Sequence, residues 1–444
     1  MAPPETPIQP AQSTAAKPVA VALKAPVVTG PQGWRVARLV VAPHRLGFFC
    51  AVTILVLASL WWLVVQWDRS TGTLGLHYAL SSTITHGTVM VFGFMPLFFS
   101  GFLFTAGPKW LNVPPYLARQ LLAPLLLQLA GWILWLIGAF AGRGLAVTAL
   151  FVAWLGLAGM FGMFWRLVLL SKAPDRMHGL SVGCGGLVGV IGLGGAAVSL
   201  LLGQDGLELV FVQSALWGFI VVVFSTVAHR MIPYFTHNVV PSVAAWRPRW
   251  ILGMMLGVAA FEVVAEWVAY FAPSPNAWPA WTWLCVLAEV VIGVTLLWVA
   301  LVWGVMRSMR DHLLAMLHIG FSWFGIALVY SALGRVLWIT TGSAVLGVGA
   351  LHALAMGFLG SLMLAMVTRV TCGHSGRPLV ADALSWGLFM LLQITVLVRL
   401  LAAIQSVPIS WTVAAAFLWA LVVTVWGLRF AGWYGKPRAD GKPG

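Results

Sequence analysis

Residues 46–66 read LGFFCAVTILVLASLWWLVVQ, a run of 21 positions without one Asp, Glu, Lys or Arg. At a rise of ~1.5 Å per residue, a helix of that length measures about 30 Å, which is the thickness of the hydrocarbon core of a bilayer. We therefore interpret this run as a transmembrane helix.

Comparable apolar runs recur along the rest of the chain. Together they predict an all-α fold, a polytopic membrane protein with about 12 transmembrane helices. The predicted spans cover roughly residues 46–66, 83–106, 120–141, 145–170, 179–202, 207–231, 250–271, 281–306, 312–333, 344–369, 382–404 and 410–430.

The composition agrees with a membrane protein and excludes a water-soluble globule. Of the 444 residues, 61% are hydrophobic and only 8% are charged, against about 25% charged in an ordinary soluble domain. A net charge of +14 would suggest nucleic acid in a soluble protein, but in a membrane protein it indicates basic cytoplasmic loops. We expect no nucleic-acid partner. The four cysteines are scattered, so neither a disulfide framework nor a zinc site is encoded.

The distribution of basic residues predicts the orientation. When each Lys and Arg is assigned to the nearer end of its span, 21 fall on one side of the membrane and 4 on the other. Because cytoplasmic loops collect basic residues, both termini are predicted to be cytoplasmic. We divide the chain into a disordered cytoplasmic tail (1–33), a twelve-helix domain (34–431) and a basic cytoplasmic tail (432–444).

Two histidines are predicted to lie at similar depth near the external face. His86 is about one turn inside the second span and His352 about two turns inside the tenth, each with glycines close by. Two imidazoles on different helices can ligate one haem iron axially, so they are candidate haem ligands. Alternatively, each imidazole bonds a backbone carbonyl within the bundle.

A second group of histidines is predicted in the cytoplasmic half. His318 is about two turns inside the ninth span, His229 lies near the end of the sixth, and His374 follows the tenth, close to Cys372. Imidazole suits copper and iron, and a cysteine could add a soft ligand. We expect His318 and His229 to approach each other at a second metal or substrate site, with His374 as a further candidate. Alternatively, His229 and His374 only form hydrogen bonds at the membrane interface, and a Glu or Tyr side chain satisfies His318.

Three acidic residues fall within predicted spans. Glu262 and Glu266 share one face of the seventh span, and Glu289 lies on the eighth. Buried carboxyl groups take up protons readily, so these residues are candidates for a proton path. Equally, they could pair with an arginine such as Arg335 or Arg369.

One long motif runs from the tenth predicted span into the loop that follows. Residues 351–357 read LHALAMG, residues 366–369 read MVTR and residues 373–379 read GHSGRPL. This arrangement resembles the NnrS family, in which a His-Ala-Leu span ends in Met-x-x-Arg before Gly-His-[Thr/Ser]-Gly-Arg-Pro-Leu. The signature residues include Arg369, Gly373, Gly376 and Arg377. Shorter matches at 92–94, 101–106, 232–236 and 317–320 extend the resemblance over most of the membrane domain.

The resemblance implies a multi-pass protein of the bacterial cytoplasmic membrane that contains haem, expected as haem b, and copper. It also implies a role linked to nitric oxide, denitrification or nitrosative stress, with nitric oxide or a nitrosylated small molecule as a partner besides the lipid bilayer. It favours His86, His318 and His352 as functional residues more than it favours His374. No reaction is implied, so the sequence leaves open whether the protein is an enzyme.

The second span departs from the family pattern. Many NnrS proteins read Trp-His-x-His-Glu-Met there, whereas residues 85–90 read THGTVM. The first histidine is kept as His86, and Thr88 and Val89 replace the second histidine and the acid. A haem ligand at His86 still agrees with the resemblance, which no longer supports a further metal at this position.

Other functions stay open at this point. A proton-coupled secondary transporter without haem would use the buried His and Glu residues as a relay. A haem-copper-oxidase-like enzyme that reduces nitric oxide would need neighbouring histidines on spans six and seven, and the seventh span has none. A gas-sensing or metal-handling protein without turnover is a third alternative.

Overall fold

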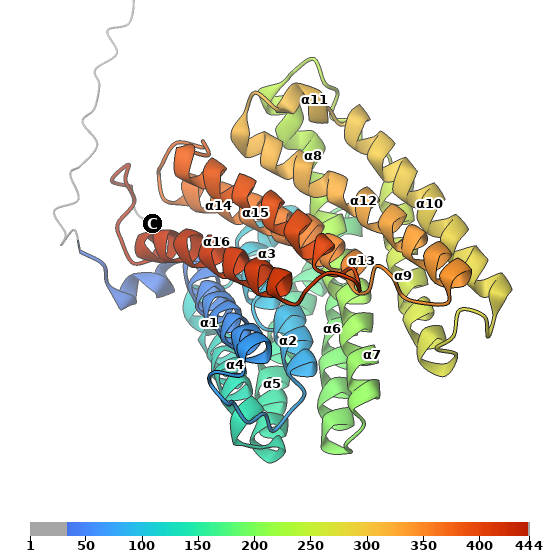
Figure 1. Cartoon of the computed structure of the whole chain (residues 1–444). Helices are drawn as coiled ribbons and strands as arrows, with labels where there is room; N and C mark the ends of the chain where they lie inside the picture. The colour runs from blue at the N-terminus through green and yellow to red at the C-terminus, as the bar shows by residue number, and fades with distance from the viewer. Residues whose placement is uncertain (1–32, 443–444) are drawn as a thin grey trace, which may run out of the picture.

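The computed structural model describes residues 33–442, which form a helical bundle without strands over that range (Figure 1). Twelve helical segments of the described chain are long and apolar enough to cross a membrane. The predicted fold class and number of spans are therefore confirmed. The predicted tail at 1–33 lies, apart from Gly33, outside the described residues.

Most spans are single helices. They are α1 (Pro43–Thr71), α4 (Leu122–Ala141), α5 (Arg143–Leu170), α6 (Met177–Leu201), α9 (Arg249–Phe271), α10 (Pro279–Val302), α12 (His312–Thr341), α15 (Ala383–Leu401) and α16 (Ser410–Tyr434). Short helices outside them are η1 (Val36–Val41), η2 (Ala118–Leu121), which leads into α4, and α11 (Val305–Ser308).

The second span is divided into α2 (Ser82–Phe92) and α3 (Met95–Leu111). Pro96 stands in the first turn of α3 and has no N–H to bond the carbonyl of Phe92, so the helical ladder is interrupted there. At Gly93, an added Cβ would lie 2.4 Å from the carbonyl oxygen of Val89. The sequence predicted one uninterrupted span at this point.

The sixth and tenth spans each contain a π-helical segment. In the sixth, η3 (Leu216–Val221) joins α7 (Asp205–Ala215) to α8 (Val222–Val239). In the tenth, η4 (Ala353–Gly360) joins α13 (Gly349–His352) to α14 (Ser361–His374). Such segments are rare and are frequently found at functional sites.

The packing order places the N-terminal helices and the α9–α12 group on opposite sides of the bundle. Contacts run from α4 to α5, from α5 to α6, from α6 to α7 and from α7 to α9, and α10 packs along α12. In Figure 1, α6 and α7 lie between the blue N-terminal helices and the yellow α9, α10 and α12, while α14 to α16 cross the bundle.

Glycines allow the closest helix contacts. On α4, a Cβ at Gly131 would lie 2.6 Å from the backbone nitrogen of Ala153 on α5, and a Cβ at Gly138 would lie 2.8 Å from that of Ala146. Small residues at helix crossings let backbones approach within a membrane, where packing rather than hydrophobic transfer holds helices together.

Candidate functional site

His86 and His352 line one cavity of about 130 Å³. His86 lies five residues into α2, and His352 is the last residue of α13, so both lie near the start of their spans. The cavity is bounded by α1, α2, the start of α3, η3, η4, α15 and α16. Two histidines that are 266 positions apart in the sequence thus meet around one space.

The ring of His352 is held in one tautomer. Its Nδ1 lies 2.9 Å from the carbonyl oxygen of Val348, one turn earlier. Because a carbonyl only accepts a hydrogen bond, Nδ1 carries the proton and Nε2 keeps a free lone pair. A backbone carbonyl on one ring nitrogen is the usual support for a histidine that ligates a metal through the other nitrogen.

The ring of His86 is supported by an aromatic neighbour. Trp62 of α1 stacks on it, with ring centroids 3.8 Å apart and an interplanar angle of 13°. The His86 Nδ1 atom is buried and has no hydrogen-bond partner in the part of the chain that the structure describes. Ring-nitrogen lone pairs lie in the ring plane, so stacking on the face fixes the orientation of His86 and leaves the lone pair open.

Arg399 of α15 supplies the cavity with a positive charge. Its Nη1 atom is buried and without a hydrogen-bond partner among the described residues. The neighbouring lining is largely apolar, with Met90 and Met356 among its side chains. A buried guanidinium hydrogen that bonds nothing carries a desolvation cost, which an anionic group placed in the cavity would offset.

Both π-helical segments contribute to the cavity wall. Leu216 and Ile220 face it from η3, and Ala355 and Leu359 face it from η4. The irregular turns of the sixth and tenth spans thus lie beside the two histidines. Sequence periodicity does not reveal a change from i+4 to i+5 hydrogen bonding, so neither segment could be predicted from it.

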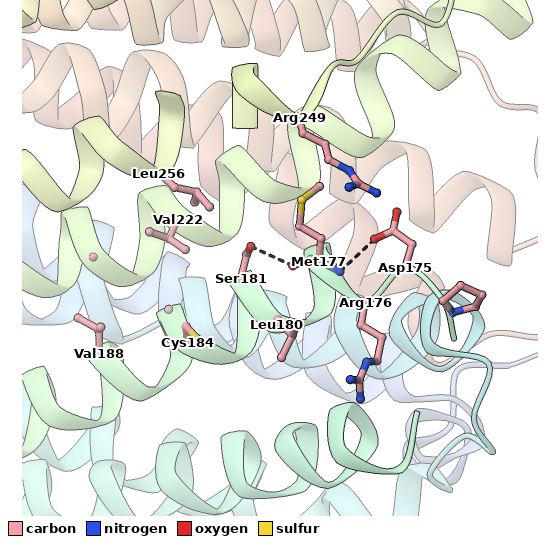
Figure 2. A pocket seen from close by; sticks show the side chains of 13 residues that line it. Asp175, Arg176, Met177, Leu180, Ser181, Cys184, Val188, Val222, Arg249 and Leu256 are labelled. Atoms are coloured by element: carbon pink, nitrogen blue, oxygen red, sulfur yellow. Dashed lines mark hydrogen bonds between the residues drawn. The ribbon is translucent and has the colours of Figure 1, made fainter. Parts of the chain in front are cut away.

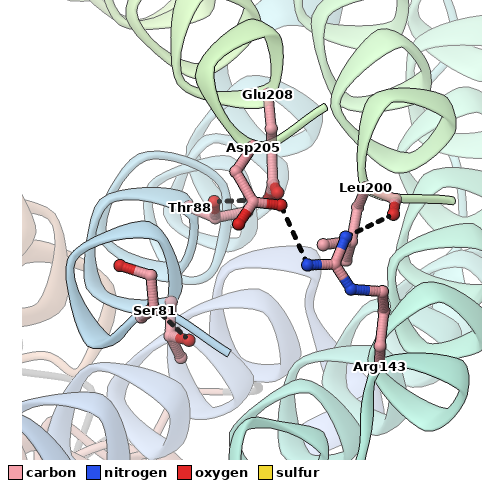
Figure 3. A network of polar contacts seen from close by, with 7 residues as sticks. Ser81, Thr88, Arg143, Leu200, Asp205 and Glu208 are labelled. Atoms are coloured by element: carbon pink, nitrogen blue, oxygen red, sulfur yellow. Dashed lines mark hydrogen bonds and ion pairs between the residues drawn. The ribbon is translucent and has the colours of Figure 1, made fainter. Parts of the chain in front are cut away.

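A polar network joins α2 to the first turn of α7 (Figure 3). The Thr88 hydroxyl, two residues after His86, donates to the Oε1 atom of Glu208 at 3.3 Å. Glu208 is fully buried on the first turn of α7, and its Oε2 atom has no partner among the residues described. Nearby, Arg143 forms a 3.1 Å ion pair with Asp205 and donates to the carbonyl of Leu200. Glu208 was not among the predicted site residues, although an acid so close to the start of a span was a visible signal.

The structure pairs His229 with a histidine that was not predicted as its partner. The Nδ1 atom of His229 lies 3.1 Å from Nε2 of His178, and its Nε2 atom lies 3.1 Å from the carbonyl oxygen of Pro248. The carbonyl accepts from Nε2–H, so Nδ1 of His229 accepts from Nε2–H of His178.

The other two predicted second-site histidines have their own neighbours. Nε2 of His318 lies 2.8 Å from the Thr236 hydroxyl, and Thr236 is seven residues, or about 10 Å of helix, beyond His229 on α8. His374 packs on His44 of α1 with ring centroids 4.5 Å apart. Within residues 33–442, no three His, Cys, Asp or Glu side chains form a group that could hold a metal ion.

The signature residues after the tenth span have structural contacts. Arg369 lies 3.8 Å over the ring of Phe235, and Arg377 lies 4.0 Å over that of Trp433. A Cβ at Gly373 would meet the side chain of Leu379 at 3.3 Å.

The C-terminal segment returns to this same region. Gly376 has a φ of +70°, and a Cβ there would lie 2.5 Å from the Asp440 carboxyl group. Ala439 donates to the Ser375 carbonyl at 2.8 Å. The described residues of the predicted tail at 432–444 therefore include the end of α16, which continues to Tyr434, and a segment that packs on the signature.

The three predicted proton-path residues come together around one arginine. Arg335 of α12 forms ion pairs with Glu289 at 2.9 Å and with Glu262 at 3.7 Å. Glu266 lies one turn from Glu262 on α9. Of the two predicted arginine partners, Arg335 is the one that pairs with these carboxyl groups.

A wider groove lies elsewhere and has no predicted site residue in its wall. This groove of about 670 Å³ follows α6, α8 and α9 (Figure 2). Two of its polar side chains are engaged locally, because the Asp175 carboxylate accepts from the Met177 backbone N–H and the Ser181 hydroxyl donates to the Met177 carbonyl. The smaller cavity at His86 and His352 presents unpartnered polar atoms, so we regard it as the candidate site.

Comparisons with known proteins place the chain in a family. The family model described as NnrS protein matches residues 38–438, nearly the whole chain. No curated protein matches the sequence. Since the family match runs from η1 to the segment after α16 and includes every candidate residue above, the chain belongs to the NnrS family.

Proposed function

We propose that the cavity binds a haem through His86 and His352, and that the protein acts as a membrane haem protein in the response to nitric oxide or nitrosative stress. The observation that carries this proposal is the set of groups around one cavity: two imidazoles and the unpartnered guanidinium of Arg399. Family membership agrees with it, because the NnrS resemblance implies haem.

The donor set fits a haem chemically. Histidine nitrogens are common axial ligands of haem iron, and Val348 already holds His352 in the tautomer that leaves Nε2 free. The propionate carboxylates of a haem are anions that could accept from Nη1 of Arg399. The apolar part of the wall suits the porphyrin faces.

Haem binding also requires the cavity to widen. A volume of about 130 Å³ is below the ~300–1,000 Å³ of typical small-molecule sites. Met90, Met95 and Met356 line the space, and the unbranched methionine side chain adapts to new shapes more readily than other apolar residues. We expect these methionines to move when the group enters.

When bound, haem would supply an iron centre that can exchange electrons. The residues of the chain would orient and shield it. His352 is fixed by Val348 and His86 by Trp62, Arg399 offers a counter-charge, and the apolar wall excludes water.

Copper has less support. The predicted second-site residues His318, His229 and His374 each have a different neighbour, and the described chain offers no three-ligand group for a metal. We derive no chemical step through copper. The comparison of His318→Ala with His229→Ala tests this prediction, because a second metal site would show a larger loss of bound metal in the His318 variant.

A proton-coupled transporter without haem is the second candidate function. The carboxyl groups around Arg335 favour it, since buried ionisable residues frequently mark proton pathways in transporters. Absorption spectroscopy of the protein purified in detergent separates the two functions. A haem protein shows a Soret band, and a transporter without haem shows none.

His86→Ala and His352→Ala are each expected to lose most of the bound haem. His237→Ala is the matched control, because His237 bonds the Val243 carbonyl and does not line the cavity. If wild-type protein produced with ample haem contains none, the haem proposal is wrong. If both histidine variants keep a wild-type spectrum, the haem lies elsewhere. The role in nitrosative stress is tested in a strain that lacks this protein and is grown with a nitric oxide donor. Restored growth with the wild-type protein, but not with the histidine variants, would support that role.

A further inference from the structure

Three neighbouring helices bring buried charges together. Glu262 and Glu266 lie on α9, Glu289 on α10 and Arg335 on α12, three helices that lie on the same side of the bundle in Figure 1. Glu289 is fully buried and Glu262 is only 3% exposed. Two of these carboxyl groups, Glu262 and Glu289, form ion pairs with the guanidinium of Arg335, and Glu266 lies one turn from Glu262.

The guanidinium is committed mainly to Glu289. Nε of Arg335 donates to Oε1 of Glu289 at 2.9 Å, and the Ser331 hydroxyl donates to the same oxygen at 2.9 Å. Hydrogen bonds to a carboxylate favour its charged form, so Glu289 is the ionised partner of Arg335.

Glu266 has a different donor. With the amide group of Gln213 oriented to donate, its nitrogen lies 2.7 and 2.8 Å from the two oxygens of Glu266. A donor placed on both oxygens again favours the carboxylate. Gln213 belongs to α7, three residues before η3, so this carboxyl group is held by a separate helix.

Glu262 is left without comparable donors. Its Oε2 atom lies 3.7 Å from Nη2 of Arg335, beyond hydrogen-bond distance, and its Oε1 atom has no partner among the described residues. The remaining titratable group that faces the cluster is the Cys285 thiol, one turn before Glu289 on α10, and a thiol adds no positive charge. A third negative charge here would be poorly balanced in a low-dielectric medium.

We infer that Glu262 is a proton-binding site, and that its carboxyl group is protonated at neutral pH while Glu266 and Glu289 are ionised. The side chain of Arg335 is 28% exposed, so the cluster reaches the surface of the bundle. This inference does not depend on haem, because none of these side chains lines the cavity of His86 and His352.

Infrared spectroscopy of the full-length protein in detergent tests this inference. A protonated carboxyl group has a carbonyl stretching band that is separate from the carboxylate bands and shifts in D₂O. We expect the difference between wild type and Glu262→Gln at pH 7 to contain this band, with an intensity of about one carboxyl group per chain. Glu208→Gln is the matched control, because Glu208 is also fully buried but lies beside Thr88. Its loss should leave the Glu262 band in place.

Two further variants should change the band in opposite directions. Glu289→Gln frees Arg335 to pair with Glu262, so Glu262 should ionise and its band should disappear at pH 7. Arg335→Gln removes the cation that pairs with Glu289 and Glu262, so Glu289 should also become protonated and the band should about double. The inference would be overturned if the infrared difference spectrum between wild type and Glu262→Gln contained no acid band that shifts in D₂O. If Arg335→Gln does not fold, the Glu262→Gln variant alone decides the question.

Discussion

The cavity pair, His86 and His352, and the bonded pair, His178 and His229, differ in what lies between the two rings. The cavity pair borders an open space that also holds an unpartnered guanidinium. In the bonded pair the ring nitrogens are 3.1 Å apart, and the chain of hydrogen bonds ends on the Pro248 carbonyl. Two histidines on neighbouring helices therefore do not define a ligand site by themselves. A ligand site also requires a cavity between the two rings and polar atoms around it that have no partner.

The side of the membrane on which the cavity pair lies depends on the topology, and reporter fusions test that topology directly. The 21-to-4 distribution of Lys and Arg predicts that both termini are cytoplasmic, which would place the cavity pair toward the external face. Fusions at residue 20 and at the C-terminus should both report a cytoplasmic location. Two external reporters would invert the assignment.

Filling the space between the cavity pair should abolish haem binding while both histidines remain. Ala416 is buried in the cavity wall on α16, so Ala416→Leu places three additional carbons where the porphyrin would lie. Ala414→Leu is the control, since Ala414 is exposed on the same helix. Haem content per chain is the measurement. Equal haem in the two variants would show that the cavity is not the site.

Removing the charge at the cavity should weaken haem retention without abolishing it. A hydrogen bond to a charged group contributes ~1.5–3 kcal/mol, so Arg399→Gln should release haem about tenfold faster or more. The rate of haem transfer to an excess of apomyoglobin measures this effect. Arg399→Lys keeps the charge and should lie between the wild type and the Gln variant. Unchanged release in Arg399→Gln would mean that this guanidinium does not contact the haem.

Breaking the bonded pair should affect stability and leave haem content unchanged. His229→Ala removes the acceptor for Nε2–H of His178, and an unsatisfied buried donor costs about 1–3 kcal/mol. We expect a lower midpoint of thermal unfolding in detergent with wild-type haem per chain. Loss of haem in this variant, with the fold retained, would contradict the distinction between the two pairs.

Apolar runs and glycine positions made much of the fold predictable. Uncharged runs such as 46–66 identify spans because the bilayer tolerates few alternatives, and the twelve predicted spans are the twelve of the structure. Gly93 and Pro96 could have indicated the interruption of the second span. It was not predicted, because the apolar run is long enough for one uninterrupted helix.

The site was predictable only in part. His86 and His352 could be matched because their depth along a helix follows from residue number. Depth does not fix the rotation of a helix about its axis, so the partner of His229 could not be identified as His178. Arg399 lay inside a predicted span and was counted as a loop charge, although a cation there is itself a sign of a site.

The π-helical turns of η4 absorb one residue of chain length between His352 and α14. Each i+5 hydrogen bond encloses one residue more than an i+4 bond, so deleting a single residue between Ala353 and Gly360 could restore an α-helix without breaking the span. Because π-helical turns rotate less per residue than α-helical turns, this deletion would leave His352 on the side of the helix that faces the cavity. The same deletion within α14 would instead turn His352 by about 100° relative to the residues that follow, the rotation of one residue in an α-helix. In alignments of this family, a one-residue gap within η4 is therefore compatible with a histidine at the cavity, whereas a one-residue gap within α14 is not.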